Sequence, residues 1–199
     1  MKLFYAPGAC SLAPHIVACE AGIDIELCKV NLQTKKIETG GDYREINPKG
    51  YVPALQLEGG EVLTECQAIL QFLAEQKPEK MLAPEFGTLP HYRMLEWLNF
   101  IAAEIHKSFV PLFWDGSEEE KARANQLVSE RFQFVEDQLD GDYLLGDDFT
   151  VADAYLFTVY NWCARVRVDT GNWPKLKAFA ERMSARAGVK KAMQDEGLA

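Results

Sequence analysis

One cysteine of this 199-residue chain occupies a position suited to thiol chemistry. Cys10 follows a short apolar run, residues 3–5, and a Pro7-Gly8 turn, and it precedes a predicted helix. The first N–H groups of a helix lack internal partners and carry partial positive charge, which lowers a thiol pKa below its reference of about 8.5. Such a thiolate attacks disulfides or holds a thiol ligand. The alternative is a buried cysteine that acts only as a small hydrophobe. The neighbouring Ser11 is expected to cap the helix.

Two further pairs of residues could complete a site for a peptide ligand. Val52-Pro53 opens a predicted strand, and a cis bond there would turn the preceding backbone groups outward to pair with a ligand, although most X–Pro bonds are trans. Glu65-Cys66 lies where a strand ends and a helix begins. Backbone N–H groups at that point suit a carboxylate, and the Glu65 side chain suits an ammonium group. Alternatively, Glu65 interacts only with the helix dipole.

The remaining cysteines and histidines indicate no metal site. Cys19, Cys28 and Cys163 lie inside apolar patterns and are expected to be buried. The number of cysteines is odd and no pair has CxxC spacing, so neither a zinc site nor a disulfide framework is expected. His15 and His91 are interpreted as structural or surface residues.

Composition and charge narrow the class of protein. The net charge of −9 argues against nucleic-acid binding, which depends on clustered Lys and Arg. No apolar run approaches the ~18 residues that a membrane span requires. The first residues lack the apolar stretch and cleavage site of a signal peptide, so a cytoplasmic location without membrane partners is expected.

The pattern along the chain predicts the elements that position these residues. The first part has the order β-α-β, loop, β-β-α, with a helix over 11–21 that ends before Gly22, a hairpin around Gly59-Gly60 and a helix over 65–76. A segment rich in Pro and Gly, residues 78–87, is the predicted linker. We therefore expect an α/β domain over 1–77 and an all-helical domain over 88–199.

The helical part carries one long apolar stripe and two capping motifs. A single helix is predicted over 89–113, and its stripe comprises Leu95, Leu98, Ala102, Ile105, Phe109 and Leu112. At 100° per residue, Asn99, Ala103 and His106 fall within roughly 60° of one another beside that stripe. Ser117 with Glu120, and Thr150 with Asp153, fit capping boxes, and a last helix begins near Pro174.

Several motifs occur together in a characteristic order: Pro-Gly-Ala-Cys-Ser at 7–11, Val-Pro-Ala-Leu at 52–55, Thr-Glu-Cys-Gln-Ala-Ile at 64–69 and Thr-Val-Ala-Asp-Ala-Tyr at 150–155. With residues 96–107, they make the whole chain resemble bacterial glutathione S-transferases of the cysteine-dependent beta class. The resemblance implies an α/β thioredoxin-like N-terminal domain, an all-α C-terminal domain and a homodimer.

The resemblance also implies roles for individual residues. Cys10 would contact the glutathione sulfur, Val52 before a cis Pro53 would pair with the cysteinyl unit, and Lys35 would meet the glycyl carboxylate. Glu65 and the backbone of Cys66 would hold the γ-glutamyl end. The expected cleft residues of the helical part are Asn99, Ala103, Glu104, Ile105 and His106, with His106 bonding the thiol at a pKa close to neutral.

Cys66 departs from the small residue, often Ser, that the family has there. We expect both Cys66 and Cys10 to be pushed toward thiolate at helix N-termini, with glutathione lying between them. Tyr5 is ranked below Cys10 as a site residue because it lies in the first strand.

The expected activity is the transfer of glutathione, as its thiolate, to a hydrophobic electrophile, with Phe109, Phe113 and Trp114 as candidate pocket walls. Glutathione is then a co-substrate, and no cofactor is expected. One alternative is a glutathione-dependent thiol–disulfide oxidoreductase that uses the same Cys10. The other is a non-catalytic binding or regulatory protein on the same fold.

Overall fold

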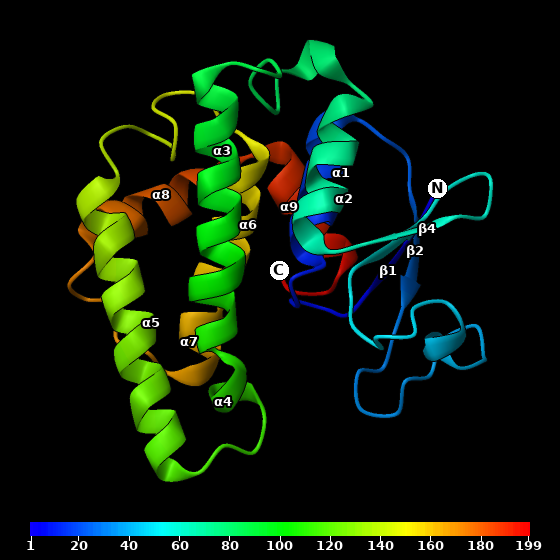
Figure 1. The fold of residues 1–199 in the computed structure, drawn as a ribbon, viewed down its shortest axis with the longest axis horizontal. Helices are drawn as coiled ribbons and strands as arrows, with labels where there is room; N and C mark the ends of the chain where they lie inside the picture. The colour runs from blue at the N-terminus through cyan, green and yellow to red at the C-terminus, as the bar shows by residue number, and fades with distance from the viewer. The chain divides into compact units, whose positions relative to one another are not determined.

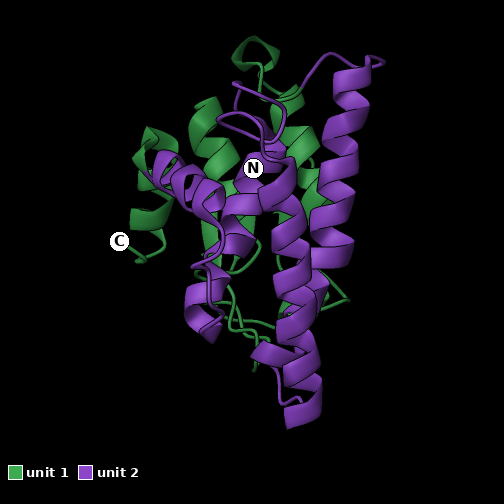
Figure 2. Ribbon diagram, turned by 90° about the vertical axis from the view of Figure 1, so that its left-hand side faces the viewer, with its two compact units in different colours: residues 1–83, 185–199 green, residues 84–184 purple.

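The computed structural model describes residues 1–199 and divides into two compact units (Figure 2). Unit 1 comprises residues 1–83 and 185–199, and unit 2 comprises residues 84–184. The sequence predicts one helical domain over residues 88–199. Residues 185–199 cluster with unit 1 instead, because the last helix packs on the first.

Unit 1 is built on a four-stranded mixed sheet with strand order β2-β1-β3-β4. The strands are β1 (Lys2–Tyr5), β2 (Glu26–Lys29), β3 (Ala54–Gln56) and β4 (Val62–Thr64). β1 runs parallel to β2 and antiparallel to β3, and β3 pairs with β4 as the predicted hairpin. Helices α1 (Leu12–Ala21) and α2 (Cys66–Glu75) pack on each other and lie on the same side of this sheet (Figure 1). This arrangement confirms the thioredoxin-like architecture.

The last helix, α9 (Ala187–Asp195), packs on α1, and the Glu20 carboxylate of α1 binds groups at the start of α9. Glu20 accepts a hydrogen bond from Arg186 Nη2 at 2.6 Å and another from the Gly188 N–H at 3.0 Å. A Cβ on Gly188 would lie 2.6 Å from Glu20 Oε1, so only glycine permits this close approach. The chain end is thereby brought against the helix that follows Cys10.

Unit 2 is helical, as predicted, and the residues of its helices follow in chain order: α3 (Leu89–Phe100), η3 (Ile101–His106), α4 (Val110–Phe113), α5 (Glu118–Gln138), α6 (Val151–Tyr160), α7 (Trp162–Val166) and α8 (Pro174–Ala185). Both predicted capping boxes are confirmed, at the starts of α5 and α6. Short 3₁₀ turns, η1 (Tyr43–Glu45) and η2 (Pro78–Lys80), belong to unit 1. None of the helices combines the length and the apolar character needed to cross a bilayer.

The predicted single helix over 89–113 is wrong in two respects. Residues 101–106 form a π-helix, and the helix is interrupted again before α4. Of the predicted stripe, Leu98, Ile105 and Phe109 are buried as expected. Leu95, Ala102 and Leu112 are only partly buried, and Met94 and Ile101 are fully buried beside them. Hydrogen bonds from i to i+5 widen the turn over residues 101–106, so a wheel drawn at 100° per residue does not describe that segment.

Candidate functional site

The Cys10 loop joins the end of β1 to α1 and is held by hydrogen bonds on both sides. Ser11 Oγ accepts from the Ala6 N–H at 3.1 Å, and Ser11 makes no side-chain cap on α1, in contrast to the expectation. Gly8, at φ +66°, donates its N–H to Glu196 Oε2 at 2.8 Å. The loop therefore presents Cys10 immediately before the first turn of α1 with its backbone fixed.

The Cys10 thiol faces the cis Val52-Pro53 bond, which confirms the predicted isomer. Cys10 Sγ donates to the Val52 carbonyl oxygen at 3.2 Å. The segment before Val52 is held by Tyr43, whose buried hydroxyl donates to the Tyr51 carbonyl at 2.8 Å, and by Asn47 Nδ2, which donates to the same carbonyl at 2.7 Å. A thiol thus lies beside a strand-opening backbone, the arrangement expected for pairing with a cysteinyl peptide.

Tyr5 does not compete with Cys10 for the chemical role. It is buried, and burial raises the pKa of its phenol above the ordinary value of 10.0. A phenol that holds its proton more firmly than in water is a poor source of phenolate near neutral pH. This supports the ranking of Tyr5 below Cys10.

Cys66 contacts Cys10 directly, and its thiol holds its proton more firmly than expected. Its thiol donates to the Cys10 carbonyl oxygen at 3.6 Å, so the Cys66 side chain contacts the backbone of Cys10. Burial, reinforced by Cys10 and Glu65, raises the pKa of Cys66 well above its ordinary value. The expectation of a thiolate at Cys66 is therefore wrong, because loss of solvation outweighs the helix N-terminus.

Glu65 is held in a backbone conformation that side chains rarely adopt. Its φ is +72° and its carboxylate is largely exposed. Lys49, which the sequence analysis did not single out, bonds both the Thr64 hydroxyl, at 2.8 Å, and the Glu65 carboxylate. Non-glycine residues at positive φ concentrate at ligand sites, where the surrounding structure holds them in place. Nothing in the local sequence marks Lys49, because its partners Thr64 and Glu65 are 15 and 16 residues away.

Lys35 reaches the same region from the long loop after β2. Its ammonium donates to the Gly50 carbonyl at 2.9 Å and lies 5.9 Å from the centre of the Tyr51 ring. Burial, with a contribution from Arg44, lowers the pKa of Lys35 from 10.5. Unit 1 thus brings Lys35, Lys49 and Glu65 near the Cys10 and Val52 pair, with charges of both signs for a zwitterionic ligand.

The predicted cleft residues of unit 2 differ widely in solvent exposure. Asn99, Ala103 and Glu104 are exposed, and Glu104 pairs with Arg131 Nε at 3.0 Å. Ile105 is fully buried, so its side chain is not available to a ligand. The roles of these residues toward glutathione stay predictions.

His106 is part of an aromatic cluster in unit 2. Its Nδ1 lies 2.7 Å from the Tyr155 hydroxyl, and its ring meets Trp162 edge-on with centroids 4.8 Å apart. Burial, with a smaller effect of Lys107, lowers the pKa of His106 to about 4. The expected near-neutral pKa is therefore wrong, and His106 is uncharged at pH 7.

The candidate pocket walls separate into core and surface. Phe109 is fully buried and stacks on Phe113 at a centroid distance of 5.9 Å, so Phe109 belongs to the core of unit 2. Phe113 and Trp114 remain exposed, at 38% and 53% of their surface. Only these two remain candidates for contact with an electrophile.

Comparison with known proteins agrees with this description. Residues 8–76 match the glutathione S-transferase N-terminal domain and residues 100–187 match the glutathione S-transferase C-terminal domain. The chain is 45% identical to glutathione S-transferase GstA of Escherichia coli O157:H7, with both chains covered completely.

Two solved structures show the same fold over their full lengths. The bacterial beta-class glutathione S-transferase of Sphingomonas chungbukensis superposes with a TM-score of 0.97 at 46% identity, covering 100% of both chains. A sphingomonad glutathione S-transferase complexed with glutathione superposes with a TM-score of 0.96, also at 46% identity and with 100% of both chains covered.

Proposed function

The chain belongs to the glutathione S-transferase family, and we propose that unit 1 binds glutathione with its thiol against Cys10. The protein is a glutathione transferase of the beta-class type. The observation that carries the proposed site is the Cys10 thiol at the start of α1, 3.2 Å from the carbonyl of Val52. Glutathione is a co-substrate here, and the transfer uses no other group.

Groups of unit 1 are suited to bind each of the three residues of glutathione. Val52 pairs its backbone with the cysteinyl unit, so that the glutathione sulfur meets Cys10 at the N-terminus of α1. The exposed Glu65 carboxylate takes the γ-glutamyl ammonium group, and the N–H groups at the start of α2 take the neighbouring carboxylate. Lys35 receives the glycyl carboxylate.

The reaction is substitution or addition at an electrophilic carbon. The bound glutathione releases its thiol proton to solvent and the sulfur forms a bond to carbon. In substitution a leaving group departs with the bonding electrons, and in addition the resulting carbanion takes a proton from solvent. Because a thiolate is already a strong nucleophile, positioning and desolvation supply most of the acceleration. The exposed Phe113 and Trp114 suit a hydrophobic electrophile.

Thiol–disulfide exchange through Cys10 is a second proposed activity. The Cys10 thiolate attacks the sulfur of a glutathione disulfide, forms a mixed disulfide and releases one glutathione thiolate. Its support is the same geometry, because the thiol that lies beside the ligand sulfur is also the one able to attack a disulfide there.

A homodimer and a cytoplasmic location complete the proposal. Unit 2 exposes an aromatic groove along α3 and α5 that includes Trp97, Phe100 and Phe134, and a second copy of the chain would cover it. The cytoplasm supplies reduced glutathione. Size-exclusion chromatography with light scattering is expected to give twice the chain mass of 22.4 kDa, and a mass of one chain would contradict the dimer.

The test of the site compares two thiols that lie side by side. Cys10→Ala is expected to abolish disulfide reduction and to change glutathione affinity and the rate of conjugation to an activated chloroarene. Cys66→Ala is the matched control, because Cys66 is buried and holds its proton, and it should retain both activities. Full activity in Cys10→Ala would overturn the proposed site.

A further inference from the structure

A second cluster of metal-binding side chains lies in unit 1, between α1 and α9. His15 and Cys19 are four residues apart on one face of α1, and Asp195 ends α9. One ligand atom from each residue lies within 4.8 Å of the other two. We propose that His15 Nε2, Cys19 Sγ and a carboxylate oxygen of Asp195 bind one divalent, thiophilic metal ion, with Zn²⁺ as the ion that fits best.

The set of donors matches zinc chemistry. Zinc accepts imidazole nitrogen, thiolate and carboxylate together in a tetrahedron with bonds of about 2.0–2.3 Å. His15 Nε2 and Asp195 Oδ2 lie 3.5 Å apart, close to the separation of two ligands on one ion. A water molecule completes the fourth position, as in sites with three protein ligands. Hard ions such as Mg²⁺ are disfavoured by the thiolate and the imidazole.

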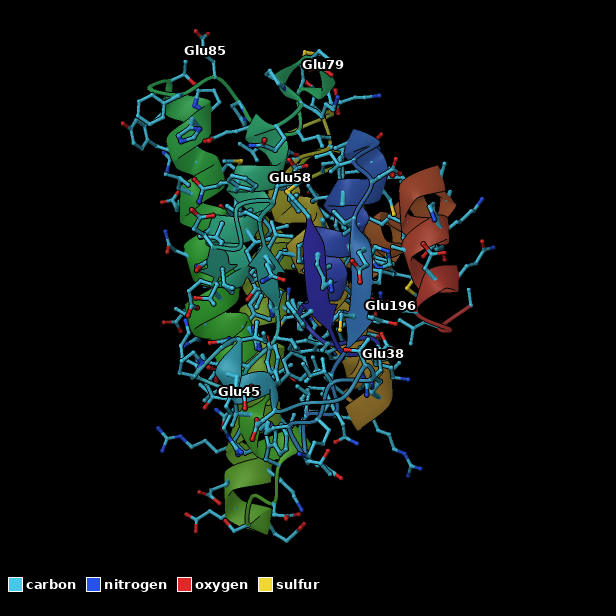
Figure 3. All side chains as sticks on the ribbon, turned by 90° about the vertical axis from the view of Figure 1, so that its right-hand side faces the viewer. Glu38, Glu45, Glu58, Glu79, Glu85 and Glu196 are labelled. Carbon is cyan, nitrogen blue, oxygen red and sulfur yellow. The ribbon has the colours of Figure 1, made fainter.

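The other nitrogen of His15 is already held in the way that metal-bound histidines require. His15 Nδ1 lies 3.0 Å from Glu196 Oε1, and the Glu196 carboxylate is buried. A ligating histidine usually donates its second N–H to a carboxylate, which fixes the ring and the tautomer. Because Nδ1 is committed to Glu196, Nε2 is the nitrogen left for the ion, and it lies toward Asp195. Figure 3 labels Glu196 at the end of the chain, next to α9.

The site is open to solvent, and a lysine and two protons compete with a metal ion for its ligand atoms. His15 is buried, Cys19 is half-buried and Asp195 is exposed, so an ion can enter from the Asp195 side. Lys191 Nζ donates to Asp195 Oδ2 at 2.7 Å and must give up this contact. Binding also displaces one proton from His15 and one from the Cys19 thiol, since metal ligands must be deprotonated.

The experiment measures Co²⁺ and Zn²⁺ binding to chelator-treated, full-length Cys10→Ala protein, in which the active-site thiol is absent. We expect one Co²⁺ per chain, with a thiolate charge-transfer band and the strong visible bands of tetrahedral Co²⁺, and displacement by Zn²⁺. Cys19→Ser in the same background should weaken Co²⁺ binding by at least about tenfold and remove the charge-transfer band. Lys191→Met should strengthen binding several-fold, because it removes the competing cation.

Thermal unfolding provides an independent readout. An ion that joins α1 to α9 binds only the folded chain, so Zn²⁺ should raise the melting temperature of the Cys10→Ala protein. The same addition should leave the Cys10→Ala, Cys19→Ser protein unchanged. Co²⁺ binding of equal strength with and without Cys19, or no charge-transfer band in the parent, would overturn the proposal.

Discussion

Two buried carboxylates organise the two units, and they differ in where their partners come from. Asp153 in unit 2 accepts from the N–H and hydroxyl of Thr150, three residues away, and from the Leu144 N–H at 2.8 Å. Glu196 in unit 1 accepts from the Gly8 N–H and pairs with His15, partners 188 and 181 residues away. One carboxylate closes a local turn, and the other joins the two ends of the chain at the Cys10 loop.

The two carboxylates also differ in how their charge is compensated. Only neutral donors surround Asp153, and burial raises its pKa to about 6 despite three hydrogen bonds. Glu196 faces a histidine instead. Burial lowers the pKa of His15, but hydrogen bonds to Cys19 and Glu196 outweigh it and the pKa rises to about 9. Glu196 is therefore one half of a buried ion pair at neutral pH, and its loss should cost more than the loss of Asp153.

The largest expected effect is that of Glu196→Ala. It removes one of the two hydrogen-bond partners of the buried imidazolium, the other being Cys19, and frees the Gly8 N–H, so the free energy of unfolding should fall by about 3–5 kcal/mol. Urea denaturation measures this fall, and the rate of conjugation should drop as the Cys10 loop loosens. Asp195→Asn is the control, since the exposed Asp195 should contribute less than about 1 kcal/mol. Equal losses in the two variants would contradict the comparison.

The pH dependence of stability should reveal the same ion pair. Because the folded pKa of His15, about 9, exceeds its unfolded value, the stabilisation is complete below pH 6.5 and is lost as pH rises through 9. The loss amounts to about 3 kcal/mol. Denaturation from pH 6 to 10 should show this decline in the wild type and a shallower one in Glu196→Gln, while the buried thiols affect both proteins alike. Parallel curves would argue against the pair.

A smaller effect is expected for Asp153→Ala. The Leu144 and Thr150 N–H groups lose their acceptor at the start of α6, and the free energy of unfolding should fall by about 2 kcal/mol. Asp153→Asn keeps one carbonyl acceptor and should lose less. If Asp153→Ala destabilises the protein more than Glu196→Ala does, the capping box of α6 contributes more stability than the Glu196 contacts, and the ranking of the two carboxylates is reversed.

The smallest effect belongs to the exposed capping box of α5. Ser117 has the same pattern as Thr150, with Glu120 at the third position, but it is surrounded by solvent. Ser117→Ala should lower stability by about 1 kcal/mol. Ser129→Ala, in the interior of the same helix, should be neutral or slightly stabilising because alanine has the higher helix propensity. A similar loss at both positions would show that the cap itself contributes nothing.

Features set by neighbouring residues could be predicted from the sequence, and those set by distant residues could not. The hairpin of β3 and β4, the two capping boxes and the left-handed Gly22 at the end of α1 all follow from short patterns. The partnership of Glu196 with Gly8 has no local signal, since it exists only once α9 packs on α1. The same holds for Asp195 beside His15 and Cys19.

Two errors at the site have physical causes of the same kind. The helical wheel assumed 100° per residue through Asn99, Ala103 and His106, but residues 101–106 form a π-helix, in which that rotation does not hold. The thiolate expected at Cys66 rested on the helix dipole alone. Burial of that side chain, which depends on tertiary packing, dominates its pKa. Both the π-helix and the burial are properties of the packed chain.

The central claim is that Cys10 is the thiol that meets the glutathione sulfur. The most direct measurement is peptide mapping by mass spectrometry after brief exposure to glutathione disulfide, in the wild type and in Cys10→Ala. The account predicts that one glutathione becomes attached to Cys10 in the wild type, with Cys66 unmodified. Equal rates of glutathione attachment in the two proteins, or attachment at Cys66 in the wild type, would contradict it.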